Sequence, residues 1–135
     1  NMNSVQASIG LANLNNINIR IETRRNRAKK FYISALTKKD VKPIINDEKQ
    51  IKLGIFWFFP LICDNRDDFI NYLDKNDVPT STIDYRIDLN PIFKNSKKDL
   101  GTQQDLFDQK FLALPLNDHI PEKEIDRFCH ILNKY

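Results

Sequence analysis

The densest group of side chains able to do chemistry is Asp84, Tyr85, Arg86 and Asp88. They follow a predicted strand and open a loop, which is a common position for ligand-binding residues. An arginine guanidinium can bind a phosphate or a carboxylate through two parallel hydrogen bonds. Two interpretations stay open: these residues bind an anionic substrate, or Arg86 and Asp88 only pair with each other and close the loop.

Patterns of the common catalytic sites are absent from the sequence. It contains no G-x-S-x-G, H-E-x-x-H, Walker A or G-x-G-x-x-G motif. Its three glycines, Gly10, Gly54 and Gly101, are too few for a glycine-rich phosphate loop. We interpret each of them as a packing or turn residue.

The cysteines and histidines have no metal-ligand spacing. Cys63 and Cys129 are not part of a C-x-x-C pattern, and we expect both to be buried free thiols. His119 and His130 each lack a histidine partner four residues away. We therefore predict surface or helix-end histidines and no metal site.

The formal charge of +3 is concentrated in Arg20–Lys30, where six basic residues accompany one acid. A nucleic-acid site needs a basic face interleaved with aromatic side chains, or a known binding module. Since neither is present, we interpret this basic segment as a solvated helix face. Arg24 and Arg25 interrupt its apolar stripe. Either their stems lie along the core edge with the charges in water, which we favour, or one pairs with an acid elsewhere.

Two helices are predicted to open the chain. Asn3 and Gln6 form a variant of the capping box that begins a short helix. A longer helix is expected from Asn15 or Asn16 to about Leu36. At helical spacing its apolar residues form one stripe. The stripe consists of Leu14, Ile17, Ile21, Ala28, Tyr32 and Ala35.

Two segments rich in β-branched and aromatic residues follow, Val41–Ile45 and Ile55–Cys63. We predict a β-hairpin in which a polar, flexible connector, Asn46–Lys52, joins the two strands. Trp57 and the neighbouring phenylalanines are interpreted as core residues.

The second half of the chain alternates helices with strands. A helix capped by Asp64 or Asn65 should end near Asn76, because Pro79 cannot continue it. The later elements are a strand at Thr80–Tyr85, a loop at Arg86–Leu100, a short helix at Thr102–Lys110, a strand at Phe111–Leu116 and a helix beginning at Pro121. The order predicts an α+β fold with a small, mostly antiparallel sheet covered by helices.

Length and composition fit one folded domain over residues 1–135, with 41% hydrophobic and 29% charged residues. The longest strongly apolar stretch, Ile55–Cys63, has nine residues, whereas a membrane-spanning helix needs about 20. The opening is polar and Asn-rich, unlike a signal peptide. We expect a cytoplasmic protein.

Five segments resemble motifs of the DegT/DnrJ/StrS aminotransferases, in the same order. Met2–Leu14 is similar to the M-N-x-hydrophobic-x-A-x-I-G-L-x-x-L segment that begins their C-terminal part. The other four are Arg24–Phe31, like their R-R-x-x-A-x-x-Y helix; Phe56–Leu61 with Arg66–Phe69, like an aromatic strand before an R-D-x-hydrophobic helix; Tyr85–Phe93, like their H/Y-x-R-x-D-x-x-P-x-F loop; and Leu112–Leu116, like their L-x-L-P strand. The resemblance covers essentially the whole chain.

The resemblance implies the C-terminal small domain of a fold-type I sugar aminotransferase. These enzymes transfer an amino group, commonly from glutamate, to a keto-sugar nucleotide for lipopolysaccharide, other surface polysaccharides or amino sugars. Their cofactor is pyridoxal phosphate, which acts as the electron sink. The Schiff-base lysine and most phosphate contacts belong to a larger upstream domain in the family. By this resemblance the present chain lacks that lysine, binds no coenzyme alone and is inactive alone.

The same resemblance suggests site residues. Asn1 would lie near the cofactor of the neighbouring subunit in a homodimer, and Met2, Tyr85, Arg86 and Asp88 near the substrate. No catalytic residue and no metal ligand is assigned. The expected partners are the upstream cofactor domain, a second subunit and a nucleotide sugar, without nucleic acid or membrane.

Two other functions compete with this hypothesis. The chain could be a stand-alone interaction module that assembles through its basic helix, with exposed apolar surface favouring self-association. It could instead bind nucleic acid through Arg20–Lys30, which would make its affinity steeply dependent on salt.

Overall fold

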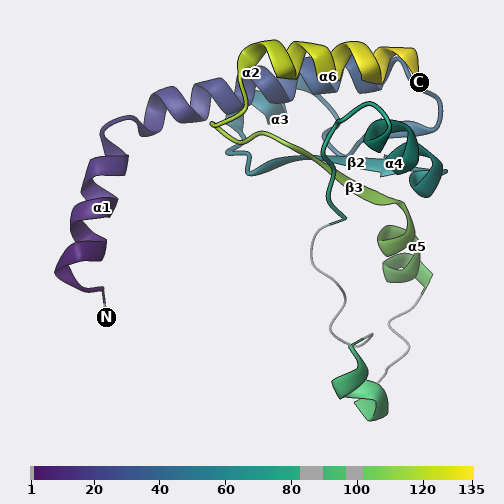
Figure 1. Cartoon of the computed structure of the whole chain (residues 1–135), viewed down its shortest axis with the longest axis horizontal. Coiled ribbons are helices and arrows are strands. Elements are labelled where there is room, and N and C mark those ends of the chain that lie inside the picture. Colours follow the sequence, from purple (N-terminus) through teal and green to yellow (C-terminus); the bar gives the residue numbers. More distant parts are fainter. Residues whose placement is uncertain (1, 83–89, 97–101) are drawn as a thin grey trace.

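A computed structural model shows a three-stranded antiparallel sheet in the order β1-β2-β3, covered by helices (Figure 1). It describes residues 2–82, 90–96 and 102–135. The strands are β1 (Val41–Pro43), β2 (Phe58–Cys63) and β3 (Phe111–Pro115). The middle strand β2 pairs on one side with β1 and on the other with β3. The predicted α+β class with a small antiparallel sheet is confirmed.

Helices make up most of the rest of the described chain. They are α1 (Ser4–Leu14), α2 (Ile17–Leu36), α3 (Glu48–Leu53), α4 (Arg66–Asp74), α5 (Thr102–Lys110), α6 (Glu122–Lys134) and a 3₁₀ helix, η2 (Pro91–Ser96). Helices α2 and α6 lie side by side along the sheet, whereas α1 projects away from the body (Figure 1). Within the described ranges, no helix has the length and apolar character needed to cross a membrane.

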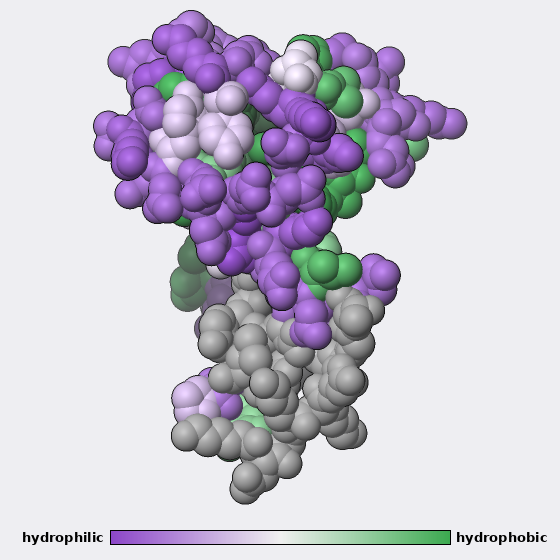
Figure 2. Space-filling model, turned by 90° about the vertical axis from the view of Figure 1, so that its right-hand side faces the viewer, coloured by the Kyte–Doolittle hydropathy of each residue, from purple (hydrophilic) through white to green (hydrophobic). Residues whose placement is uncertain are grey.

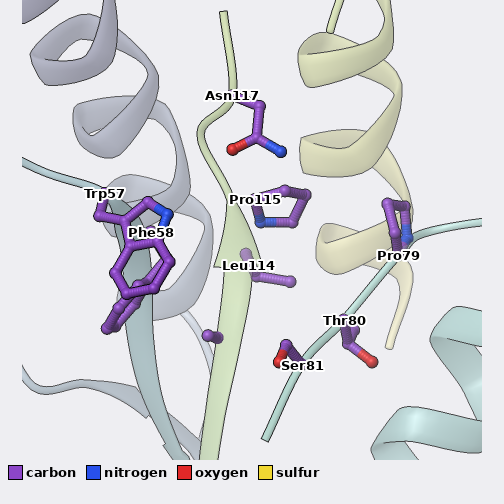
Figure 3. A pocket seen from close by; sticks show the side chains of 9 residues that line it. Trp57, Phe58, Pro79, Thr80, Ser81, Leu114, Pro115 and Asn117 are labelled. Atoms are coloured by element: carbon purple, nitrogen blue, oxygen red, sulfur yellow. The ribbon is translucent and has the colours of Figure 1, made fainter. Parts of the chain in front are cut away.

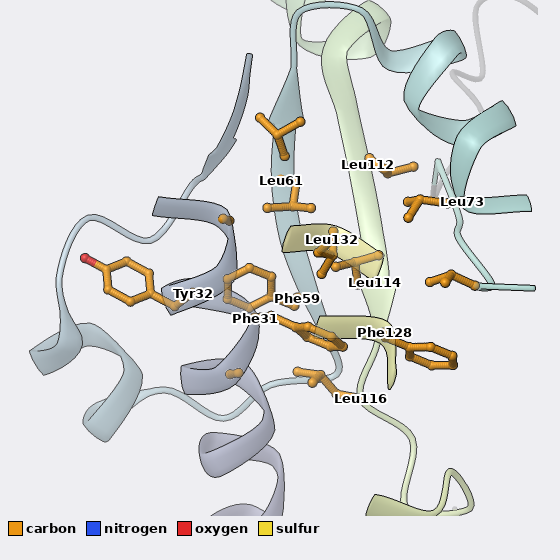
Figure 4. Close-up of a cluster of buried hydrophobic side chains, with 14 of the residues drawn as sticks. Phe31, Tyr32, Phe59, Leu61, Leu73, Leu112, Leu114, Leu116, Phe128 and Leu132 are labelled. Atoms are coloured by element: carbon orange, nitrogen blue, oxygen red, sulfur yellow. The ribbon is translucent and has the colours of Figure 1, made fainter. Parts of the chain in front are cut away.

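The hydrophobic core lies between the sheet and the α2 and α6 pair (Figure 4). Phe31 of α2 and Phe59 of β2 are fully buried, with ring centroids 5.8 Å apart. Strand β3 is buried along most of its length because side chains pack on it from both faces. Helix α6 contributes four buried residues to this core: Ile125, Phe128, Ile131 and Leu132.

The apolar stripe predicted for the long helix is right only in its second half. Ala28, Tyr32 and Ala35 are buried, but Leu14 and Ile17 are exposed. The capping box of α1 is confirmed: the Gln6 backbone N–H donates to Asn3 Oδ1 at 2.8 Å, and the Asn3 N–H donates to Gln6 Oε1 at 3.0 Å. The capping residues and the helical spacing therefore predicted the helices correctly. The burial of a side chain depends in addition on the segments that pack against the helix.

Two features of the predicted hairpin are wrong. The connector expected to be flexible contains α3, which begins because the Asp47 side chain accepts from the Gln50 N–H at 2.8 Å and which buries Ile51. Trp57 was expected in the core but is 70% exposed. It precedes β2, whose first residue is Phe58, so the sheet does not enclose it.

The second half agrees more closely with expectation. Helices α4 and α5 and strand β3 lie where they were predicted. Asn65 precedes α4, but its side chain makes no capping hydrogen bond, and the Asp64 carboxylate accepts from Lys110 Nζ at 2.7 Å. Of the strand predicted at Thr80–Tyr85, Ser81 forms an isolated bridge with Ala113, and positions 83–85 lie outside the described residues.

The segment predicted as a loop, Arg86–Leu100, is only partly described. Its residues 90–96 contain the 3₁₀ helix η2, which corrects the prediction there, and the other positions lie outside the described ranges. Both cysteines are free, with Cys63 buried and Cys129 half-buried. Burial raises the pKa of the Cys63 thiol to about 12, so this thiol stays protonated at neutral pH.

Arginines of α2 hold two chain connections against the helix. Arg24 donates from Nε and Nη2 to the two carboxylate oxygens of Asp118 at 3.0 and 3.1 Å, and Arg20 Nε donates to the same carboxylate at 2.7 Å. Arg24 Nη1 also donates to the Phe56 carbonyl at 3.1 Å. Of the two interpretations of Arg24, the disfavoured one is therefore correct: it pairs with a distant acid. We call Arg20, Arg24 and Asp118 the arginine clamp.

The clamp changes the acidity of its carboxylate. Hydrogen bonding from Arg24, and then from Arg20, lowers the pKa of Asp118 from 3.8 to about 2. The pKa of Asp118 is lower in the folded protein than in the unfolded chain, so folding favours the ionised carboxylate. Asp118 therefore stabilises the fold above about pH 4. That contribution is lost as the pH falls through 2.

The first prediction concerns the core. Leu61→Ala should lower the free energy of unfolding by about 2–5 kcal/mol, because it leaves a cavity at a fully buried site. Leu53→Ala is the matched control, since Leu53 is 73% exposed, and it should change the value by no more than about 0.5 kcal/mol. Urea unfolding followed by circular dichroism measures both. Equal effects of the two substitutions would contradict this core.

The second prediction concerns the clamp. Asp118→Asn should cost about 1–2 kcal/mol at pH 7, because charge-assisted hydrogen bonds become neutral ones. The difference in the free energy of unfolding between the wild type and Asp118→Asn should shrink as the pH falls from 4 towards 2. Urea titrations over this pH range test it, with the exposed Asp74→Asn as the control. A gap that did not change with pH would contradict the lowered pKa of Asp118.

Candidate functional site

A hollow of about 180 Å³ lies at the end of the sheet where β2 begins and β3 ends. We call it the Trp57 hollow. Its lining residues are Trp57, Phe58, Pro79, Thr80, Ser81, Ala113, Leu114, Pro115 and Asn117. Figure 3 shows Leu114 and Pro115 on β3 and Asn117 just after it, with Trp57 and Phe58 on one side and Pro79, Thr80 and Ser81 on the other.

The hollow is apolar with a few neutral polar groups at its rim. Thr80, Ser81 and Asn117 contribute two hydroxyls and a carboxamide, and none of the nine lining residues has an ionisable side chain. General acid-base or nucleophilic catalysis needs a base or an activated nucleophile. The Trp57 hollow therefore has the composition of a binding site rather than of a catalytic centre.

Polar contacts hold the backbone on both sides of this hollow. The Phe56 carbonyl accepts from Arg24, and the Gly54 carbonyl accepts from Arg25 Nε at 2.9 Å. On the other side, the Asn117 carbonyl accepts from Arg27 Nη1 at 2.6 Å. A Cβ at position 54 would lie too close to the edge of the Phe56 ring, so a larger residue there would force that ring to move. Both connections are thus bound to one rigid helix, α2.

Most of the site residues suggested by sequence cannot be placed. Asn1, Tyr85, Arg86 and Asp88 lie outside the described residues. Met2 is described and is 73% exposed at the start of the projecting helix α1. The structure therefore neither joins these residues into one site nor separates them.

The basic segment Arg20–Lys30 is not a free cationic face. Each of its six cations forms an ion pair within the chain: Arg20 and Arg24 with Asp118, Arg25 with Glu22, Arg27 and Lys30 with Glu122, and Lys29 with Glu48. Arg27 is buried, and hydrogen bonds from Lys30 and then Arg27 lower the pKa of Glu122. The prediction of a solvated face is right only in part: the side chains of Arg20, Lys29 and Lys30 are 37–48% exposed, whereas those of Arg24, Arg25 and Arg27 are 6–25% exposed.

The lysines whose side chains are described do not fit a Schiff-base role. None of them is buried, whereas such a lysine needs a pocket that lowers its pKa. Lys30 shows the opposite: hydrogen bonds to Asp126 and Glu122 raise its pKa. Among the described residues, no group of histidine, cysteine and carboxylate side chains could hold a metal ion.

Helix α1 presents apolar side chains without a partner in the described chain. None of its residues is buried, and its large hydrophobic residues, together with those that flank it, are exposed. This apolar arm consists of Met2, Val5, Ile9, Leu11, Leu14, Ile17 and Ile19. By contrast, the side of the body that carries α4, α5 and the end of α6 is mostly hydrophilic, with small, separate hydrophobic groups (Figure 2).

Sequence reasoning missed the Trp57 hollow and the exposure of the apolar arm. The hollow joins residues 57–58, 79–81 and 113–117, which only the pairing of β2 with β3 and the Ser81–Ala113 bridge bring together. A usable signal existed in α1: its apolar side chains are spread around the helix rather than confined to one stripe, which is typical of a helix with more than one partner.

Several solved structures share the fold of this chain, among them the sugar aminotransferase CalS13. CalS13 from Micromonospora echinospora matches with a TM-score of 0.80 at 19% identity, over 98% of this chain and 35% of that one. AtS13 from Actinomadura melliaura gives 0.81 at 19% identity, over 99% and 35%. DesV from S. venezuelae, solved with a ketimine intermediate, gives 0.80 at 16% identity, over 96% and 35%. The chain thus spans about a third of the length of these proteins.

Sequence comparisons add the family. No curated protein gives a significant match to this chain. A family profile, however, matches residues 1–133, nearly the entire chain, and its members are aminotransferases. With the ordered motifs and the shared fold, this shows that the chain belongs to the DegT/DnrJ/EryC1/StrS aminotransferase family.

Proposed function

We propose that this chain is the small domain of a pyridoxal-phosphate-dependent sugar aminotransferase and that it completes a site carried by a larger upstream domain. Family membership supports the activity. The solved relatives are nearly three times as long, since the chain covers 35% of each, which supports the additional domain. The described lysines do not fit the coenzyme, so we assign its covalent attachment to that domain.

The observation that carries the proposal is the apolar arm. An isolated helix of fewer than about 12–15 residues is marginal in water, and α1 has 11 residues, none of them buried. Large hydrophobic side chains exposed together mark a surface that packs against another one. We infer that the upstream domain and a second subunit cover the arm, which is also the part that would bring Asn1 and Met2 to a neighbouring cofactor.

For the substrate we propose a keto-sugar nucleotide. The similarity to the sugar aminotransferase CalS13 supports the sugar. The sequence Tyr85-Arg86-Ile87-Asp88 supports an anionic group, because a guanidinium can bind a phosphate through two hydrogen bonds. In this proposal Tyr85, Arg86 and Asp88 contact the substrate. They neither carry the coenzyme nor act as its base.

The third prediction concerns the coenzyme. The 135-residue chain mixed with pyridoxal phosphate should give no stable imine absorbance band and, after borohydride reduction, no adduct at a single lysine by mass spectrometry. The same chain joined to the upstream domain should give both, with the modified lysine in that domain. A specific, stoichiometric adduct on one lysine of this chain would refute the proposal.

The fourth prediction concerns the apolar arm. Ile9→Asp should change the free energy of unfolding of the 135-residue chain by no more than about 0.5 kcal/mol, because Ile9 is 58% exposed. In the protein that includes the upstream domain, it should disrupt assembly, measured by light scattering and coenzyme retention. Ser8→Asp adds the same charge on the same helix at a small polar side chain and is the control.

This experiment also tests the stand-alone interaction module. The interaction module is favoured if two results are found together. The 135-residue chain would form a discrete dimer that Ile9→Asp dissociates, and the upstream domain would assemble normally in the absence of the 135-residue chain. Assembly of the basic helix with a partner is disfavoured already, because its six cations are paired within the chain.

A further inference from the structure

The Trp57 hollow has the size of a single ring. Its volume is about 180 Å³, whereas pockets that enclose a whole drug-sized ligand measure roughly 300–1,000 Å³. An apolar cavity of about 150 Å³ is known to hold one benzene molecule. The hollow can therefore hold one six-membered ring, but not a complete nucleotide sugar.

The charge around the hollow selects an uncharged ring. None of the nine lining residues is ionisable, and the nearby guanidinium groups of Arg20 and Arg24 are bound to Asp118. Against these nine residues, a phosphate would lose water without gaining a cation. The polar groups are those that bind ring hydroxyls or amides: Thr80 and the carboxamide of Asn117.

Trp57 is held in place although it is exposed. The residue before it is bound through its carbonyl to Arg24. The residue after it, Phe58, begins β2 and pairs with Pro115. Its indole lies against the Phe58 ring, with centroids 5.5 Å apart and an angle of 57° between the planes. The backbone at Trp57 is thus held in place, and the indole presents an aromatic face that can bind a sugar or base ring.

We propose that the Trp57 hollow is a subsite for one uncharged ring of the nucleotide-sugar substrate, the hexose or the base, with Trp57 as stacking platform and Asn117 as hydrogen-bonding group. This inference rests on the proposed function for its ligand class. The arginine clamp acts on it indirectly, because Arg24 also binds the carbonyl of Phe56, the residue before Trp57.

The test uses the fact that Trp57 is the only tryptophan of the chain, so its fluorescence reports on the hollow alone. The 135-residue chain is titrated separately with methyl glucopyranoside, uridine and inorganic phosphate. We expect a saturable change in fluorescence with one of the first two and none with phosphate. The responding probe identifies the ring, hexose or base.

Variants then locate the binding. Asn117→Ala should weaken the affinity for the responding ring compound about five- to tenfold, which is the usual effect of losing one hydrogen bond to a ligand. Asn133→Ala is the matched control, at an exposed asparagine of α6 that does not line the hollow. For Trp57→Ala, calorimetry replaces fluorescence, and we expect at least a fivefold loss.

Several outcomes would overturn the subsite. They are a folded chain without a saturable response to either ring, a response to phosphate, or an affinity that Asn117→Ala leaves unchanged. The first would leave Trp57 as a contact for another domain. None of these depends on pyridoxal phosphate, so the subsite and the proposed aminotransferase activity can fail separately.

Discussion

The carboxylate of Asp118 is the point on which the arrangement of this domain depends. It follows β3, yet it is bound by two arginines that lie nearly a hundred residues earlier in the chain. The same Arg24 also binds the Phe56 carbonyl just before β2. One helix thus determines where the central strand begins and where its neighbour ends. A partly buried ion pair with several hydrogen bonds constrains the relative orientation of these segments more than apolar packing alone.

The positive charge of α2 is used inside the domain. A run of basic residues on a long helix commonly suggests a surface for an acidic partner. Here the acids come from α2 itself, α3, α6 and the connection before α6, and Arg27 binds two backbone carbonyls as well as Glu122. One side of α2 is thus attached to the rest of the domain by ion pairs, and another side by the buried apolar residues Phe31 and Ala35. The apolar arm, by contrast, has no partner within the described chain.

The arm and the Trp57 hollow have the same physical explanation. Each exposes hydrophobic side chains that a domain complete in itself would cover. Members of this family whose structures share the fold are about three times longer than this chain, so surfaces adapted to contacts outside the small domain are expected. On our proposal the arm contacts protein and the hollow contacts substrate. The difference follows from shape, because the arm is a convex helix and the hollow is concave.

Local sequence determined the elements of this protein and the family to which it belongs. The capping box at Asn3 and Gln6 and the apolar strand segment of β3 both act between near neighbours, and each was found where predicted. Only the tertiary structure decided the partner of Arg24, the exposure of Trp57 and the hollow beside it. Those depend on strand pairing and on ion pairs between residues far apart in the chain, and spacing along a sequence contains no information on which distant acid a given arginine will meet.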